Sequence, residues 1–109
     1  MDLKGKTALV TGGAGGIGRA ICAGLAAAGA DVAVHFHRGE AAAESLVAQL
    51  AAGGVRAAGY GADLTRPDAA SRLVERVHAG LGLDILVNNA GITLGGVDVA
   101  QTEVDDWLH

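Results

Sequence analysis

The 109-residue sequence has only one cysteine, one proline and one each of tryptophan, tyrosine and phenylalanine. The single cysteine, Cys22, excludes an internal disulfide and a zinc site built from cysteines. The net charge of -4 disfavours nucleic acid or an anionic membrane as the main partner, because either would select a basic surface. The longest apolar run, residues 20–30, is shorter than the ~17–25 residues that span a bilayer. These absences predict a cytoplasmic protein that binds neither nucleic acid nor membrane.

Small apolar residues and glycine make up much of what is present. Half of the residues are hydrophobic, and only 18% are charged, which argues against disorder. The 18 glycines follow no collagen-like period, so they are expected in turns and close contacts. The length fits a single domain, residues 1–109.

Short apolar runs alternate with helical patterns along the chain. Strands are predicted at residues 7–10, 32–36, 55–60 and 85–87. The first helical stripe consists of Ile17, Ile21, Gly24, Leu25 and Ala28, and Gly29 is expected to end that helix. A second helix covers residues 43–50, and a third follows a cap at Thr65 and Asp68. A fourth is expected to start at Thr102 and Asp105, after a loop.

This alternation is typical of βαβ units with helices on both faces of a parallel sheet. We therefore predict an α/β fold, a Rossmann-like doubly wound parallel sheet with four strands in the order 3-2-1-4. Its ligand crevice is expected above the first and fourth strands, beyond their carboxyl ends.

A glycine-rich turn joins the first predicted strand to the first predicted helix. Its residues are Gly12, Gly13, Ala14, Gly15, Gly16, Ile17 and Gly18. Amides at a helix start lack partners within the helix and carry the positive end of its dipole, so a diphosphate can bind them. The alternative is a turn that merely reverses the chain. A P-loop is excluded because no Gly-Lys-Ser/Thr sequence follows.

Two motifs together resemble the short-chain dehydrogenase/reductase family. The first is Thr11-Gly12-x-x-x-Gly16-x-Gly18, and the second is the sequence Asn88-Asn89-Ala90-Gly91 after the fourth strand. The resemblance covers nearly the whole chain and is nearest to the 3-oxoacyl-carrier-protein reductases and sugar dehydrogenases. It implies reversible oxidation of a secondary alcohol to a ketone with NADP or NAD.

The resemblance also implies roles for individual residues. The turn from Gly12 to Gly18 would hold the diphosphate and the adenosine ribose. Asp63 would accept a hydrogen bond from the adenine amino group and Leu64 would pack beside the ring, whereas the alternative for Asp63 is a loop cap near Thr65. The sequence Asn89, Ala90 and Gly91 would line the ribose and the path to nicotinamide. Asn88 is expected to tie strands together.

The end of the second strand bears on the choice of cofactor. An acid there would accept from the 2′-hydroxyl of NAD, but the sequence has Phe36, His37 and Arg38. Arg38 could instead pair with the 2′-phosphate of NADP. The alternative is a solvated Arg38, or one paired with Glu40. Gly15 stands where NADP-preferring relatives often have a basic residue, which weakens the case for NADP. On Arg38 and the missing acid, NADP is favoured and NAD remains open.

The resemblance also shows what the sequence lacks. The family uses a Ser and a Tyr-x-x-x-Lys pair for proton transfer, but the one tyrosine, Tyr60, is followed four residues later by Leu64. We therefore assign no catalytic residue and expect a C-terminally truncated chain with little or no activity. A carbonyl or alcohol substrate would bind only a full-length form.

Two alternatives remain open: a non-catalytic nucleotide-binding or interaction module, and a chain with no ligand. The fourth strand is expected to be an exposed edge, which would favour self-association. No metal site is assigned, because His35 and His37 have no evident third ligand. Cys22 is expected to be a packed side chain, and Asp84 to tether a loop.

Overall fold

The computed structural model describes residues 2–90 and the backbone of residues 101–103. Its elements in chain order are β1 (Thr7–Thr11), α1 (Gly16–Ala27), β2 (Asp31–Phe36), α2 (Glu40–Ala52), β3 (Ala57–Gly61), α3 (Ala69–Gly80), β4 (Ile85–Asn88) and β5 (Gln101–Glu103). No helix in this part of the chain is both long and apolar enough to cross a membrane.

The strands form one sheet in the order β3-β2-β1-β4-β5. The four strands β3, β2, β1 and β4 are parallel, as predicted, and β1 is central. All five residues of β1 are buried, because a strand in the middle of such a sheet is covered on both faces. The carboxyl ends of β1, β2 and β4 therefore meet at one edge of the sheet, where the ligand crevice is predicted.

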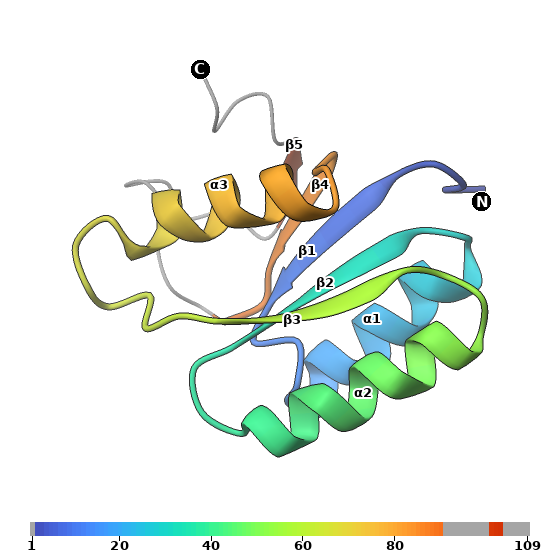
Figure 1. The fold of residues 1–109 in the computed structure, drawn as a ribbon, viewed down its shortest axis with the longest axis horizontal. Coiled ribbons are helices and arrows are strands. Elements are labelled where there is room, and N and C mark those ends of the chain that lie inside the picture. The colour runs from blue at the N-terminus through green and yellow to red at the C-terminus, as the bar shows by residue number, and fades with distance from the viewer. Residues whose placement is uncertain (1, 91–100, 104–109) are drawn as a thin grey trace.

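Helices cover both faces of the sheet (Figure 1). On one face, α1 and α2 pack over Val10, Val32 and Val34, with Cys22, Ala43, Leu46 and Leu50 completing the cluster. On the other face, α3 places Leu73, Val74 and Val77 over Leu9, Ala33 and Leu86. Neighbouring residues of β1 thus contribute to opposite layers, as the alternation of side chains along a strand requires.

Local sequence explains where the helices begin and end. The segment forming α2 is rich in alanine, leucine, glutamate and glutamine, all good helix formers. Helix α1 ends just before Gly29, which has φ +99° and so takes the left-handed conformation expected at a helix C-terminus. The predicted stop at Gly29 is confirmed.

Several predicted details were wrong. Thr102 lies in β5, antiparallel to β4, and does not cap a fourth helix. This pairing also means that β4 is not the unpaired edge that we expected. Helix α3 begins at Ala69 and not near Thr65, because the Thr65 amide and hydroxyl both bond to Asp63. The predicted Asp105 cap lies outside the described residues.

The predicted apolar face of α1 is also wrong at one residue. Ile17 was assigned to the core face of α1, but 74% of its surface is exposed. The buried residues of α1 are Gly18 and Cys22, so the helix packs through a glycine near its start. The expectation that Cys22 packs as a small side chain is confirmed, and burial raises the pKa of its thiol to about 11.

Candidate functional site

The glycine-rich turn leaves β1 through a residue that needs a left-handed backbone. Gly12 has φ +63°, a conformation that side-chain-bearing residues rarely adopt. Its N–H donates to Nδ1 of His35 at 3.0 Å, and the next amide, of Gly13, donates to the His35 carbonyl at 3.0 Å. The Gly12 carbonyl accepts from the side-chain amide of Asn89 at 3.2 Å. The turn is therefore fixed from β2 and from the end of β4.

Two glycines in the turn are required by the protein's own packing. A Cβ on Gly18 would collide with the Gly12 carbonyl oxygen and would lie 2.8 Å from Cα of Gly13. A Cβ on Gly13 would lie 3.0 Å from the Val10 carbonyl and 3.1 Å from the Val34 side chain. These glycines let α1 lie close against the strands.

Gly15 and Gly16 differ from them. A Cβ on Gly16 would meet no protein atom within 4 Å, and one on Gly15 would meet only the Gly12 carbonyl at 3.6 Å. The absence of a side chain here leaves open space directly in front of the helix start.

The start of α1 has no side-chain cap for its backbone donors. The N-cap of α1 is Gly15, which has no side chain to bond the first-turn amides, and the first turn contains no acidic residue. The first amide bonded in the helical pattern is that of Arg19, which donates to the Gly15 carbonyl at 2.7 Å. The amides of Gly16, Ile17 and Gly18 precede it, at the positive end of the helix dipole. This geometry suits an anionic group.

The end of β4 contacts the same turn. The Thr11 hydroxyl donates to the Asn88 side-chain oxygen at 3.1 Å and accepts from the Ala90 amide at 3.1 Å. These bonds join β1 to β4 at the crevice, in agreement with a tethering role for Asn88. Asn89 holds the turn itself through Gly12. The predicted residue Gly91 lies outside the described residues.

Asp63 follows β3 and collects several donors. One of its carboxylate oxygens accepts from the Thr65 amide at 3.0 Å and from the Thr65 hydroxyl at 2.6 Å. The other lies 3.7 Å from His37 Nε2 and 3.7 Å from Arg66 Nε. The bonds from Thr65, with smaller effects from His37 and Arg66, lower the pKa of Asp63. The structure thus shows the loop-cap alternative and leaves adenine recognition by Asp63 as a prediction.

The remaining predicted residues lie around Asp63 and the end of β2. His37 and Arg38 are exposed or nearly so, and among residues 2–90 no ion pair includes Arg38. The alternative in which Arg38 pairs with Glu40 is therefore absent from this part of the chain. Leu64 is 7% exposed and belongs to the core cluster under α3, so its contact with a ring stays a prediction.

Sequence analysis weighed His35 only as a metal ligand and missed its contact with the glycine-rich turn. His35 is 3% exposed, and its ring bonds to Gly12 through Nδ1 and to the Ala62 carbonyl through Nε2 at 2.9 Å. The available signal was a titratable residue inside an otherwise apolar strand, at a position facing the core. Both ring nitrogens are used in these bonds.

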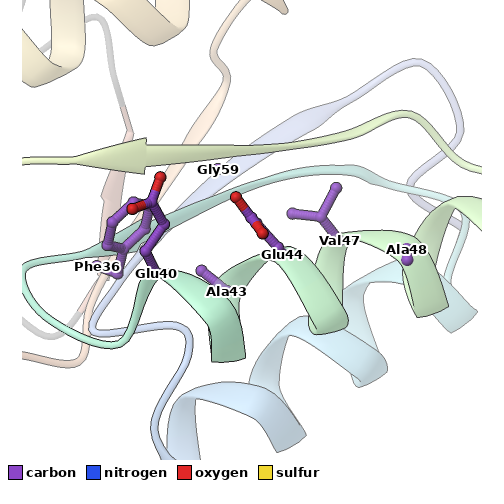
Figure 2. A pocket seen from close by; sticks show the side chains of 7 residues that line it. All are labelled: Phe36, Glu40, Ala43, Glu44, Val47, Ala48 and Gly59. Atoms are coloured by element: carbon purple, nitrogen blue, oxygen red, sulfur yellow. The ribbon is translucent and has the colours of Figure 1, made fainter.

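A surface groove elsewhere on the molecule has an apolar floor and acidic side chains beside it. It measures about 290 Å³ and lies between α2 and β3, lined by Phe36, Ala43, Val47 and Gly59. Figure 2 shows the carboxylates of Glu40 and Glu44 on the α2 side of this groove. Two carboxylates beside an apolar floor disfavour a phosphate, so the groove is a poor match for the predicted ligand.

Residues 6–109 match the family described as short chain dehydrogenase. The chain belongs to this family. A short chain dehydrogenase from the fungus Pseudocercospora fijiensis is 47% identical over 108 residues, which cover 97% of this chain and 35% of that protein.

Two solved structures of similar proteins carry bound nucleotides. A short chain dehydrogenase from Burkholderia cenocepacia in complex with NADP matches at 50% identity and a TM-score of 0.80, over 84% of this chain and 38% of that one. A blue fluorescent protein from a metagenomic library in complex with NADPH matches at 45% identity and a TM-score of 0.79, over 86% and 39%. The short-chain dehydrogenase chain described here thus spans well under half the length of these relatives.

Proposed function

We propose that this chain is the cofactor-binding part of an NAD(P)-dependent oxidoreductase that interconverts a secondary alcohol and a ketone. The observation that carries the proposal is the start of α1, where a Cβ on Gly16 would meet no protein atom within 4 Å and no side chain caps the first-turn amides. Family membership and the similar structures that hold NADP or NADPH support it.

The residues present fit such a cofactor. The diphosphate would accept hydrogen bonds from the amides at the start of α1, where a Cβ on Gly16 would occupy the space it needs. Asp63, held in its ionised form by Thr65, would accept from the adenine amino group. Asn89 and Ala90 would line the ribose from the end of β4. The bound nicotinamide would supply the hydride acceptor or donor.

Charge at the end of β2 favours NADP over NAD. No carboxylate occupies residues 36–38, so nothing there would repel a 2′-phosphate or accept from a 2′-hydroxyl. The guanidinium of Arg38, which forms no ion pair among the described residues, and the imidazole of His37 are the groups that would meet the phosphate. The Asp63 carboxylate, 3.7 Å from His37, opposes this preference, because its negative charge would repel the 2′-phosphate.

A second candidate is nucleotide binding without turnover, and one observation favours it. Tyr60, the only tyrosine of the sequence, lies on β3 with the Arg76 guanidinium over its ring at 5.4 Å, and it packs against the core cluster under α3. Residue 64 is leucine, so this chain supplies no Tyr-x-x-x-Lys pair to move the substrate proton. Substrate chemistry therefore requires groups that this sequence does not contain.

Fluorescence titration of the purified chain with NADPH and NADH tests the proposal. Saturable binding, tighter for NADPH, is the expected result. A panel of ketones incubated with the chain and NADPH then separates the two candidates, since turnover would support the oxidoreductase and binding alone would support the second function. Failure to bind either nucleotide would refute both.

A further inference from the structure

We propose that His35 is a positioning residue for the dinucleotide, acting as the acceptor that holds the Gly12 amide and, through it, the phosphate-binding turn. The inference rests on the proposed function, because it assigns to His35 the task of presenting the turn to the cofactor. No substrate or cofactor contact is assigned to the side chain itself.

The position of His35 lets it reach three segments at once. Its ring accepts from the Gly12 amide at 3.0 Å and bonds to the Ala62 carbonyl at 2.9 Å, while its carbonyl accepts from the Gly13 amide at 3.0 Å. The side chain thus connects the turn after β1 with the segment between β3 and Asp63. These two segments are the ones proposed to bind the diphosphate and the adenine.

The bonds fix the protonation state of the ring. An amide N–H can only donate, so Nδ1 must carry a lone pair where it meets Gly12. A carbonyl can only accept, so Nε2 must carry the hydrogen where it meets Ala62. His35 is therefore the neutral Nε2–H tautomer. Burial lowers the pKa of His35, which favours the same neutral form.

Protonation would remove the acceptor. A proton on Nδ1 would face the Gly12 N–H, and two donors would then oppose each other inside the fold. The titratable groups near this contact are His37 just after β2, Asp63 just beyond Ala62, and the buried thiol of Cys22 in α1, whose Sγ lies 3.9 Å from the Gly13 carbonyl. No carboxylate bonds to the ring to stabilise the cation.

If His35 Nδ1 stops accepting, the Gly12 N–H loses its hydrogen-bond partner. The Gly12 carbonyl already accepts from Asn89 and from the Gly15 amide, so the N–H is the remaining polar group of the residue. Without Nδ1 this donor is left without its partner, and the turn can move away from the geometry that presents the Gly15 to Gly18 segment. Affinity for the phosphate would fall as a result.

Two matched variants separate the two ring bonds. His35→Asn places an amide oxygen near the Nδ1 position and keeps an acceptor for Gly12. His35→Gln places its amide group near the Nε2 position and keeps the bond to Ala62 but not the one to Gly12. Affinity for NADP is measured by calorimetry from pH 5 to 8 for both variants and the unaltered chain, after NMR spectra have shown that each is folded.

We expect His35→Gln to bind NADP about tenfold more weakly at pH 8, and His35→Asn to bind within about twofold of the unaltered chain. Binding by the unaltered chain should weaken toward the acid end of this range, as the pH approaches the lowered pKa of His35, and more than binding by His35→Asn does. The ligand's own phosphate titrates near pH ~6 in both cases, so the comparison removes its effect.

Equal NADP affinity for His35→Gln and the unaltered chain would overturn the inference, as would equal losses in the two variants. Nitrogen NMR of the unliganded chain gives an independent reading, since an Nδ1–H tautomer of His35 would also overturn it. If the unaltered chain binds no NADP at any pH, the proposed function fails and the inference fails with it; failure of the inference alone leaves wild-type binding intact.

Discussion

At the scale of single residues, glycines of α1 serve different purposes. Gly18 is glycine because the backbone of the turn leaves no room for a Cβ, whereas the space beyond Gly16 is empty. Because Gly16 lies at the start of α1, where the first amides lack partners within the helix, we propose that the diphosphate approaches the backbone there.

Gly16→Ala should therefore weaken NADPH binding without destabilising the chain. We expect a loss of about tenfold or more in affinity, since an added methyl group in a filled site costs ~1–3 kcal/mol. Gly24→Ala is the control, because it also adds a methyl group to open space on α1, away from the turn. That variant should bind normally and gain about 0.5–1 kcal/mol of stability. Equal binding by both variants would contradict the role of Gly16.

We propose that Arg38 sets the preference between the two dinucleotides. Arg38→Ala should weaken NADPH binding about tenfold and leave NADH binding unchanged, because only NADPH has the 2′-phosphate. Parallel fluorescence titrations measure both. Arg56→Ala is a suitable control, since Arg56 pairs with Asp31 at the other end of β2. An unchanged ratio of the two affinities in Arg38→Ala would exclude this residue from cofactor choice.

At the scale of elements, helix ends depend on special backbone conformations. Gly29 follows α1 with φ +99°, and a Cβ there would lie 3.0 Å from the Lys4 side chain and 3.3 Å from its amide nitrogen. Gly29→Ala should lower the free energy of unfolding by about 1–2 kcal/mol, measured by urea denaturation, with NADPH affinity unchanged. Retained stability would show that the segment between α1 and β2 can adopt another path.

Periodicity predicted the first three helices and the four parallel strands because each has a distinct apolar face or run. Periodicity failed where tertiary contacts or local side-chain hydrogen bonds determine which residues are buried or where a helix begins. Ile17 fits the helical stripe, yet the approach of α1 through Gly18 turns that part of the helix outward. Thr65 resembles a helix cap, yet it bonds back to Asp63.

The residues of the candidate site also differ in whether the sequence alone could predict them. The glycine turn was visible because its chemistry is local to consecutive residues. His35 was not, because its partners at Gly12 and Ala62 lie 23 and 27 residues away along the chain and meet it only once the sheet has formed. The roles of Asp63, Leu64 and Arg38 toward a cofactor remain predictions.

At the scale of the whole molecule, the buried His35 links acidity to stability. The unfolded chain binds a proton at this residue near the ordinary pKa of 6.5, and the folded chain does so only at lower pH. Stability is therefore full above pH 6.5 and declines as the pH falls from there toward the lowered pKa. Urea denaturation from pH 8 to 5 should show this decline, and His35→Asn should flatten it. An equal decline in both proteins would assign it to other groups.

The central claim is that a dinucleotide phosphate binds at the start of α1. An NMR titration of the isotope-labelled chain with NADPH tests it most directly, because each backbone amide reports separately. We predict that the largest shifts fall on the amides of residues 15–18, with smaller ones at Asp63 and Asn89. Large shifts confined to the groove between α2 and β3, or unchanged amides at the helix start in the presence of saturating NADPH, would contradict the account.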